Sequence, residues 1–73
     1  MAYTWEDWSK VEVCREGGRR WAIVPVGDGY RVDYEDADDL DAVTVELPEI
    51  YPSRWAAIEA AEQMITKHLG VTH

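Results

Sequence analysis

The chain has 73 residues, 47% of them hydrophobic and 11% aromatic, and 15 acids against 7 bases give a formal net charge of −8. This length predicts one small domain over residues 1–73, and the apolar content is too high for a disordered acidic tail. The negative charge excludes a general basic face for binding DNA, RNA or an anionic membrane, and it favours a basic protein partner.

The first predicted element is a short helical turn over residues 4–8, TWEDW. Thr4 is a good N-cap, and Asp7 follows three residues later as in a capping box. Trp5 and Trp8 would then lie on one side of the turn. There they either cover an open end of the core or contact a partner, since tryptophan is enriched at interface hot spots.

Segments that alternate between apolar and polar residues predict three or four antiparallel strands. These segments are residues 10–15, 19–26, 30–34 and 42–47. Gly17-Gly18 and Gly27-Asp28-Gly29 predict the hairpin turns between the first three, because glycine accepts positive φ. Pro25 predicts an edge position, a bulge or a strand end, because proline cannot donate to the ladder.

The alternation also predicts which side chains face the core. Val11 and Val13 are expected to point one way on the first strand, and Val43, Val45 and Leu47 inward on the last. The opposite face is expected to be solvated, and it would carry Lys10, Glu12, Cys14, Arg31, Asp33, Thr44 and Glu46.

Residues 54–69 predict the longest helix, with Ser53 as its N-cap and Gly70 as its stop. Its predicted apolar stripe consists of Trp55, Ile58, Ala61, Ile65 and Leu69. The fold class expected is therefore α+β: a three- to four-stranded antiparallel sheet with one C-terminal helix packed on one face.

The most unusual segment is residues 33–41, DYEDADDLD, which contains no base. No register in it places acids at positions one, three and five and glycine at six, as a calcium loop of the EF type requires. One cysteine and two histidines, His68 and His73, are too few for a zinc site. We therefore predict no specific metal site and no cofactor.

Catalytic residues are not predicted either. Nothing in the sequence brings Cys14 and His68 together as nucleophile and base. The carboxylates lie in a polar run, and they lack the apolar pocket that raises the pKa of a catalytic acid. We expect a protein that is not an enzyme.

Two interpretations of the acidic segment remain: a solvated loop, or a carboxylate array that imitates nucleic-acid phosphates. In an extended segment, alternate side chains are about 6.6 Å apart on one face, on the scale of steps along a nucleic-acid backbone. The predicted partner-binding residues are Asp33, Glu35, Asp36, Asp38, Asp39 and Asp41, together with Trp5 and Trp8.

In size, charge and sheet-plus-helix layout, the whole chain resembles the small acidic proteins that phages encode against host defence, above all the anti-CRISPR proteins. The resemblance rests on no motif, so no residue roles carry over. It implies a stoichiometric inhibitor of a nucleic-acid-binding effector complex. The layout is also similar to modules that bind double-stranded RNA or DNA, but those need a basic face.

The alternative function is a structural or assembly module. Its helix has small residues on two sides, Ala56, Ala57, Ala60 and Ala61, so it would permit close packing of two copies; the chain is expected to be a monomer or a homodimer. The single Cys14 favours a reducing compartment, and no signal peptide or membrane span is visible, so a cytoplasmic location is expected.

Overall fold

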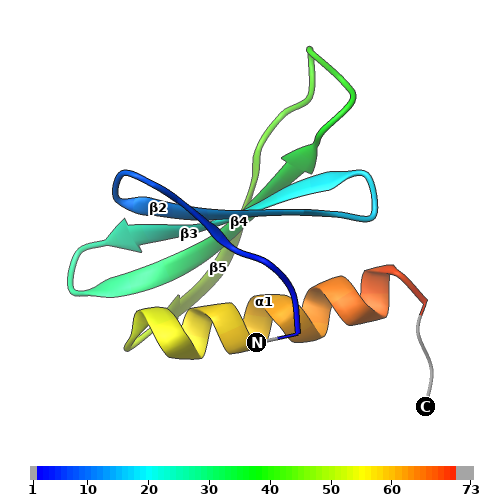
Figure 1. The fold of residues 1–73 in the computed structure, drawn as a ribbon. Helices are drawn as coiled ribbons and strands as arrows, with labels where there is room; N and C mark the ends of the chain where they lie inside the picture. The colour runs from blue at the N-terminus through cyan, green and yellow to red at the C-terminus, as the bar shows by residue number, and fades with distance from the viewer. Residues whose placement is uncertain (1, 71–73) are drawn as a thin grey trace.

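The computed structural model describes residues 2–70, in which one antiparallel sheet lies against a single helix (Figure 1). The five strands follow one another in the sheet in chain order. The elements are β1 (Glu6–Trp8), β2 (Val11–Glu16), β3 (Arg19–Val26), β4 (Gly29–Asp36), β5 (Val45–Tyr51) and α1 (Arg54–His68). The α+β class is confirmed, with five strands instead of three or four. His73 lies outside the described residues.

The predicted N-terminal helix is wrong, because residues 6–8 form the edge strand β1. Trp8 lies opposite Val11, and Glu6 lies opposite Val13. The turn between β1 and β2 contains Ser9 at a φ of 63°. Pairing with β2 satisfies backbone groups that a single helical turn would leave open, and tryptophan is well suited to a strand.

The Gly17-Gly18 hairpin is confirmed. Both glycines have positive φ, 62° and 74°, as a tight two-residue hairpin turn requires. A Cβ atom added to Gly17 would lie 2.6 Å from Cδ2 of His68, so the turn also packs closely on the end of α1. This contact ties the β2–β3 hairpin to the helix.

The predicted faces of β2 are reversed. Cys14 lies opposite Trp21 and belongs to the core between the sheet and α1, whereas Val13 lies on the other face of the sheet. Glu12 lies on the helix side, where its Oε1 accepts a hydrogen bond from Arg54 at 3.2 Å. Both faces of this strand are partly covered, so alternation alone does not indicate which one meets the helix.

The last strand begins three residues later than predicted. Val43 lies outside β5 and is 83% exposed, Val45 is also exposed, and only Leu47 packs against the core. Pro48 lies within β5, and the pairing with β4 shifts register between Arg31 and Asp33. A proline and a bulge are tolerated here because β5 is an edge strand.

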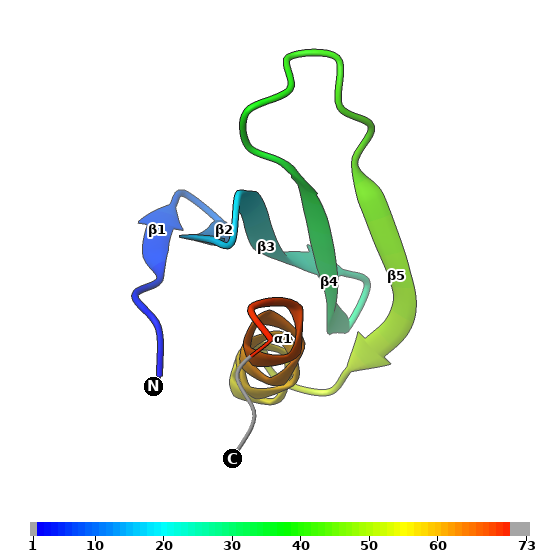
Figure 2. The same ribbon diagram turned by 90° about the vertical axis from the view of Figure 1, so that its right-hand side faces the viewer.

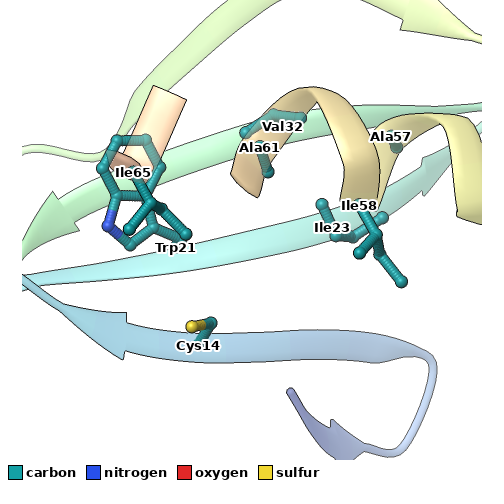
Figure 3. Close-up of a cluster of buried hydrophobic side chains, with 8 residues drawn as sticks. All are labelled: Cys14, Trp21, Ile23, Val32, Ala57, Ile58, Ala61 and Ile65. Atoms are coloured by element: carbon teal, nitrogen blue, oxygen red, sulfur yellow. The ribbon is translucent and has the colours of Figure 1, made fainter. Parts of the chain in front are cut away.

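The sheet curves around α1, which packs mainly on β3, β4 and β5 (Figure 2). Ser53 caps the helix by accepting a hydrogen bond from the Ala56 N–H at 3.1 Å. Buried side chains from both layers interdigitate in the core (Figure 3). They are Cys14, Trp21, Ile23, Val32, Ala57, Ile58, Ala61 and Ile65.

The apolar stripe of α1 is only partly as predicted. Ile58, Ala61 and Ile65 are buried, but Trp55 is 63% exposed and Leu69 is also exposed. These two residues lie at opposite ends of the predicted stripe, and the sheet covers only its middle. Residues 2–70 contain no helix that is long and apolar enough to cross a membrane.

We expect Ile65→Ala to lower the free energy of unfolding by about 2–5 kcal/mol, because it leaves a cavity at a fully buried site. Gln63→Ala, at an exposed position of the same helix, should change it by no more than about 0.5 kcal/mol. Urea denaturation followed by circular dichroism measures both. Equal effects would contradict the assigned core.

Candidate functional site

Residues 37–44, which we call the acidic loop, connect β4 to β5 and project from the end of the sheet, away from α1 (Figures 1 and 2). Short hydrogen bonds within the segment shape its turns. The Asp38 N–H donates to Oδ1 of Asp36 at 3.1 Å, and the Asp41 N–H donates to Oδ1 of Asp39 at 2.9 Å. Aspartate favours such local turns.

The structure divides the six predicted carboxylates into two groups. Asp33 is 6% exposed and lies within β4, where Arg31 donates to both of its oxygens at 2.6 and 3.0 Å. Arg31 also lies 3.5 Å from the carboxylate of Glu46 on β5. The Asp33 carboxylate is therefore already paired with Arg31 inside the sheet.

Glu35 is also paired within the fold. Nη1 of Arg20, on β3, lies 2.6 Å from Oε1 of Glu35. The hydroxyl of Thr44 donates to its other oxygen at 3.3 Å, which holds the C-terminal end of the acidic loop near β4. Glu35 therefore contributes to the structure at the base of the loop.

The second group consists of exposed carboxylates. Within residues 2–70, no lysine, arginine or histidine forms an ion pair with any of them. They are Asp36, Asp38, Asp39 and Asp41. The uncompensated charge of the segment is concentrated in these four side chains.

A hollow of about 620 Å³ lies between the acidic loop and the β2–β3 turn. Asp38, Asp39 and Val43 line it from the loop, and Tyr34 and Arg19 line it from the sheet. The Arg19 guanidinium lies 4.3 Å from the centre of the Tyr34 ring. The hollow thus combines carboxylates with the Arg19 guanidinium, an aromatic ring and an apolar side chain.

Trp5 and Trp8 do not share one surface as predicted. Trp5 packs against the core, and its Nε1 donates to Glu62 on α1 at 3.1 Å. Trp8 lies opposite Val11, is 51% exposed, and donates to Glu6 at 3.0 Å. Neither tryptophan lines the hollow beside the acidic loop.

Cys14 and His68 have separate roles in the structure. Burial, reinforced by Glu16 and Glu62, raises the pKa of the Cys14 thiol to about 11 and keeps it protonated. Nε2 of His68 lies 2.9 Å from the Gly17 carbonyl oxygen. Across residues 2–70, no group of three or more histidine, cysteine or acidic residues is arranged to hold a metal ion.

No family model, curated protein or solved structure matches the chain. The pairing of Arg31 with Asp33 could have been predicted from the sequence, because the two residues lie two positions apart on the same face of one strand. The pairing of Arg20 with Glu35 could not, because it depends on the register between β3 and β4. The hydrogen bond from Trp5 to Glu62 could not be predicted either, because the two residues are 57 positions apart.

Replacing Arg31 alone should be destabilising. Arg31→Met leaves the Asp33 carboxylate inside the sheet without its partner, and we expect the free energy of unfolding to fall. The double variant Arg31→Met/Asp33→Val should recover most of that loss, because it removes both charges. Urea denaturation measures the cycle. A double variant as unstable as the single one would count against a buried pair.

Glu62 should make the stability depend on pH. Burial alone raises its pKa, but hydrogen bonds from Trp5 and the N–H groups of Tyr3 and Ala2 outweigh burial and hold the pKa below its ordinary value. A pKa lowered by folding stabilises the protein above the ordinary glutamate pKa of about 4.3, and this stabilisation is lost as pH falls through the folded-state value.

The comparison is wild type against Glu62→Gln by urea denaturation between pH 3 and 7. The wild type should be the more stable at neutral pH, and the difference should shrink at the acidic end. A difference that is constant over this range would show that the carboxylate charge of Glu62 contributes nothing.

Proposed function

We propose that this chain is a non-enzymatic inhibitor that binds a basic site on a nucleic-acid-binding protein and excludes the nucleic acid from it. The observation that carries the proposal is the group of four exposed carboxylates at Asp36, Asp38, Asp39 and Asp41, none of which forms an ion pair within residues 2–70. A projecting loop can enter a basic channel that the body of the domain cannot.

The phosphate-like array is smaller in this proposal than the sequence predicts. Asp33 and Glu35 are paired with Arg31 and Arg20, so they are not free to contact a partner. The array is therefore limited to Asp36 and the acidic loop. The net charge of −8 adds a long-range attraction that speeds encounter with a basic partner and weakens at high salt.

The resemblance to anti-CRISPR proteins supplies the class of partner. In this proposal the chain acts in the cytoplasm of a host cell and occupies the nucleic-acid channel of a defence effector complex. Its small size suits stoichiometric binding, and the absence of a basic face suits it to meet the protein and not its nucleic acid.

Self-association through the alanine-rich helix has less support from the geometry. Ala57 and Ala61 are fully buried against the sheet, so only Ala56 and Ala60 remain partly accessible to a second copy. Light scattering over a range of protein concentrations tests this alternative. A molecular mass that rises to that of a dimer would support self-association.

The main test neutralises the four free carboxylates. The variant Asp36→Asn/Asp38→Asn/Asp39→Asn/Asp41→Asn keeps the side-chain acceptors that shape the turns. We expect partner affinity to fall by about fourfold to several hundredfold, because four exposed ion pairs contribute about 0.2–1 kcal/mol each. The salt dependence of binding should fall with it. Affinity is measured against the partner captured from the native host and then purified.

A matched control changes the net charge by the same four units on other surfaces. It uses the exposed acids of β1, the β3–β4 turn and β5: Glu6→Gln, Asp7→Asn, Asp28→Asn and Glu49→Gln. This control should bind nearly as well as wild type. Equal losses in the two variants would mean that only total charge matters, and unchanged binding by the loop variant would refute the proposed site.

A further inference from the structure

Trp55 is an exposed aromatic side chain for which the fold has no evident use. It lies in the first turn of α1 and is 63% exposed, whereas Trp21 in the core is 2% exposed. An isolated exposed leucine or valine is ordinary, but exposed tryptophan is enriched where proteins bind partners. The surroundings of Trp55 indicate which chemistry it would bind.

Trp55 lines two hollows. The first, of about 270 Å³, is lined by Trp55, Ile58, Glu59 and Glu62. The second, of about 470 Å³, is lined by Trp55 and Ile58 together with Glu12, Tyr30, Ser53 and Arg54. The side chains of Trp55 and Ile58 are therefore common to both hollows.

The two hollows differ in charge. In the second, Arg54 lies 3.2 Å from the Glu12 carboxylate, so the two charges offset each other. In the first, Glu59 is exposed and makes no hydrogen bond or ion pair within residues 2–70. Glu62 adds a second carboxylate, whose oxygens already accept hydrogen bonds from Ala2, Tyr3 and Trp5. The first hollow is therefore anionic and has no base among its lining residues.

We propose that this first hollow binds an arginine side chain of a partner protein, with the guanidinium stacked on the indole of Trp55 and donating to Glu59. A guanidinium is planar, stacks on aromatic faces and donates to carboxylates through a fixed fork of N–H groups. The chain already contains this pairing, because the Arg19 guanidinium lies 4.3 Å from the centre of the Tyr34 ring and 5.6 Å from that of Trp21.

The helix dipole opposes a cation at Trp55, because its partial positive charge is confined to the first turn, which contains Trp55. The exposed Glu59 carboxylate is the group that favours a cation here. Glu59 lies four residues after Trp55, so its carboxylate is on the same side of α1 and one turn further from the positive end. The site lies on the helix side of the molecule, far from the acidic loop (Figure 1), so the inference is independent of the proposed function.

The test uses N-acetyl-L-arginine methylamide as the probe and follows the four tryptophan indole N–H signals by two-dimensional NMR of the whole chain. We expect a saturable shift of the Trp55 signal in the millimolar range, with little change at Trp8, which is also exposed and beside a glutamate. The norleucine and glutamate analogues of the probe should bind at least about fivefold more weakly, since they lack the cation.

Variants separate this site from simple charge attraction. Trp55→Ala should abolish the saturable shifts of neighbouring backbone signals, and Glu59→Gln should weaken probe binding about two- to fivefold. The four-residue variant of Asp36 and the acidic loop should bind the probe like wild type. Equal binding of the norleucine analogue, shifts of equal size at Trp8, or no saturation would each overturn the inference.

Discussion

The burial of Trp21 between the sheet and α1 is the interaction on which the rest of the structure depends. The centre of its ring lies 5.0 Å from the centre of the Tyr34 ring and 6.0 Å from that of His68. Its Nε1 donates to the Glu16 carbonyl oxygen at 3.3 Å. Cys14 lies directly opposite it on β2. One side chain thus contacts β2, β4 and the last turn of the helix.

The inward position of Trp21 also decides where the charges go. Successive side chains of a strand point to opposite faces, so Arg20 must lie on the outer face of β3 when Trp21 lies on the inner one. There it meets Glu35 across the β3–β4 ladder. The core and the charge pattern are therefore consequences of one register, and changing that register would expose the core and break the ion pair together.

This pattern leaves the domain with two surfaces of different chemistry. At the end of the sheet, Asp36 and the acidic loop present carboxylates that form no ion pair within residues 2–70. On the helix side, Trp55 and Glu59 combine an aromatic face with one carboxylate. The first surface suits long-range attraction to many positive charges, and the second suits close contact with a single cation.

The sequence by itself determined the α+β class, the glycine turn between β2 and β3, the span of β3 and the helix after Ser53, because local periodicity, φ requirements and capping are properties of neighbouring residues. Only the tertiary structure decided that β1 is a strand, that Cys14 faces the core and that Trp55 does not. It also decided which carboxylates are free, since the bond from Arg20 to Glu35 joins residues from different strands. Such contacts depend on strand register and on where the sheet ends beneath the helix. Neither property can be predicted from the pattern of neighbouring residues in the sequence.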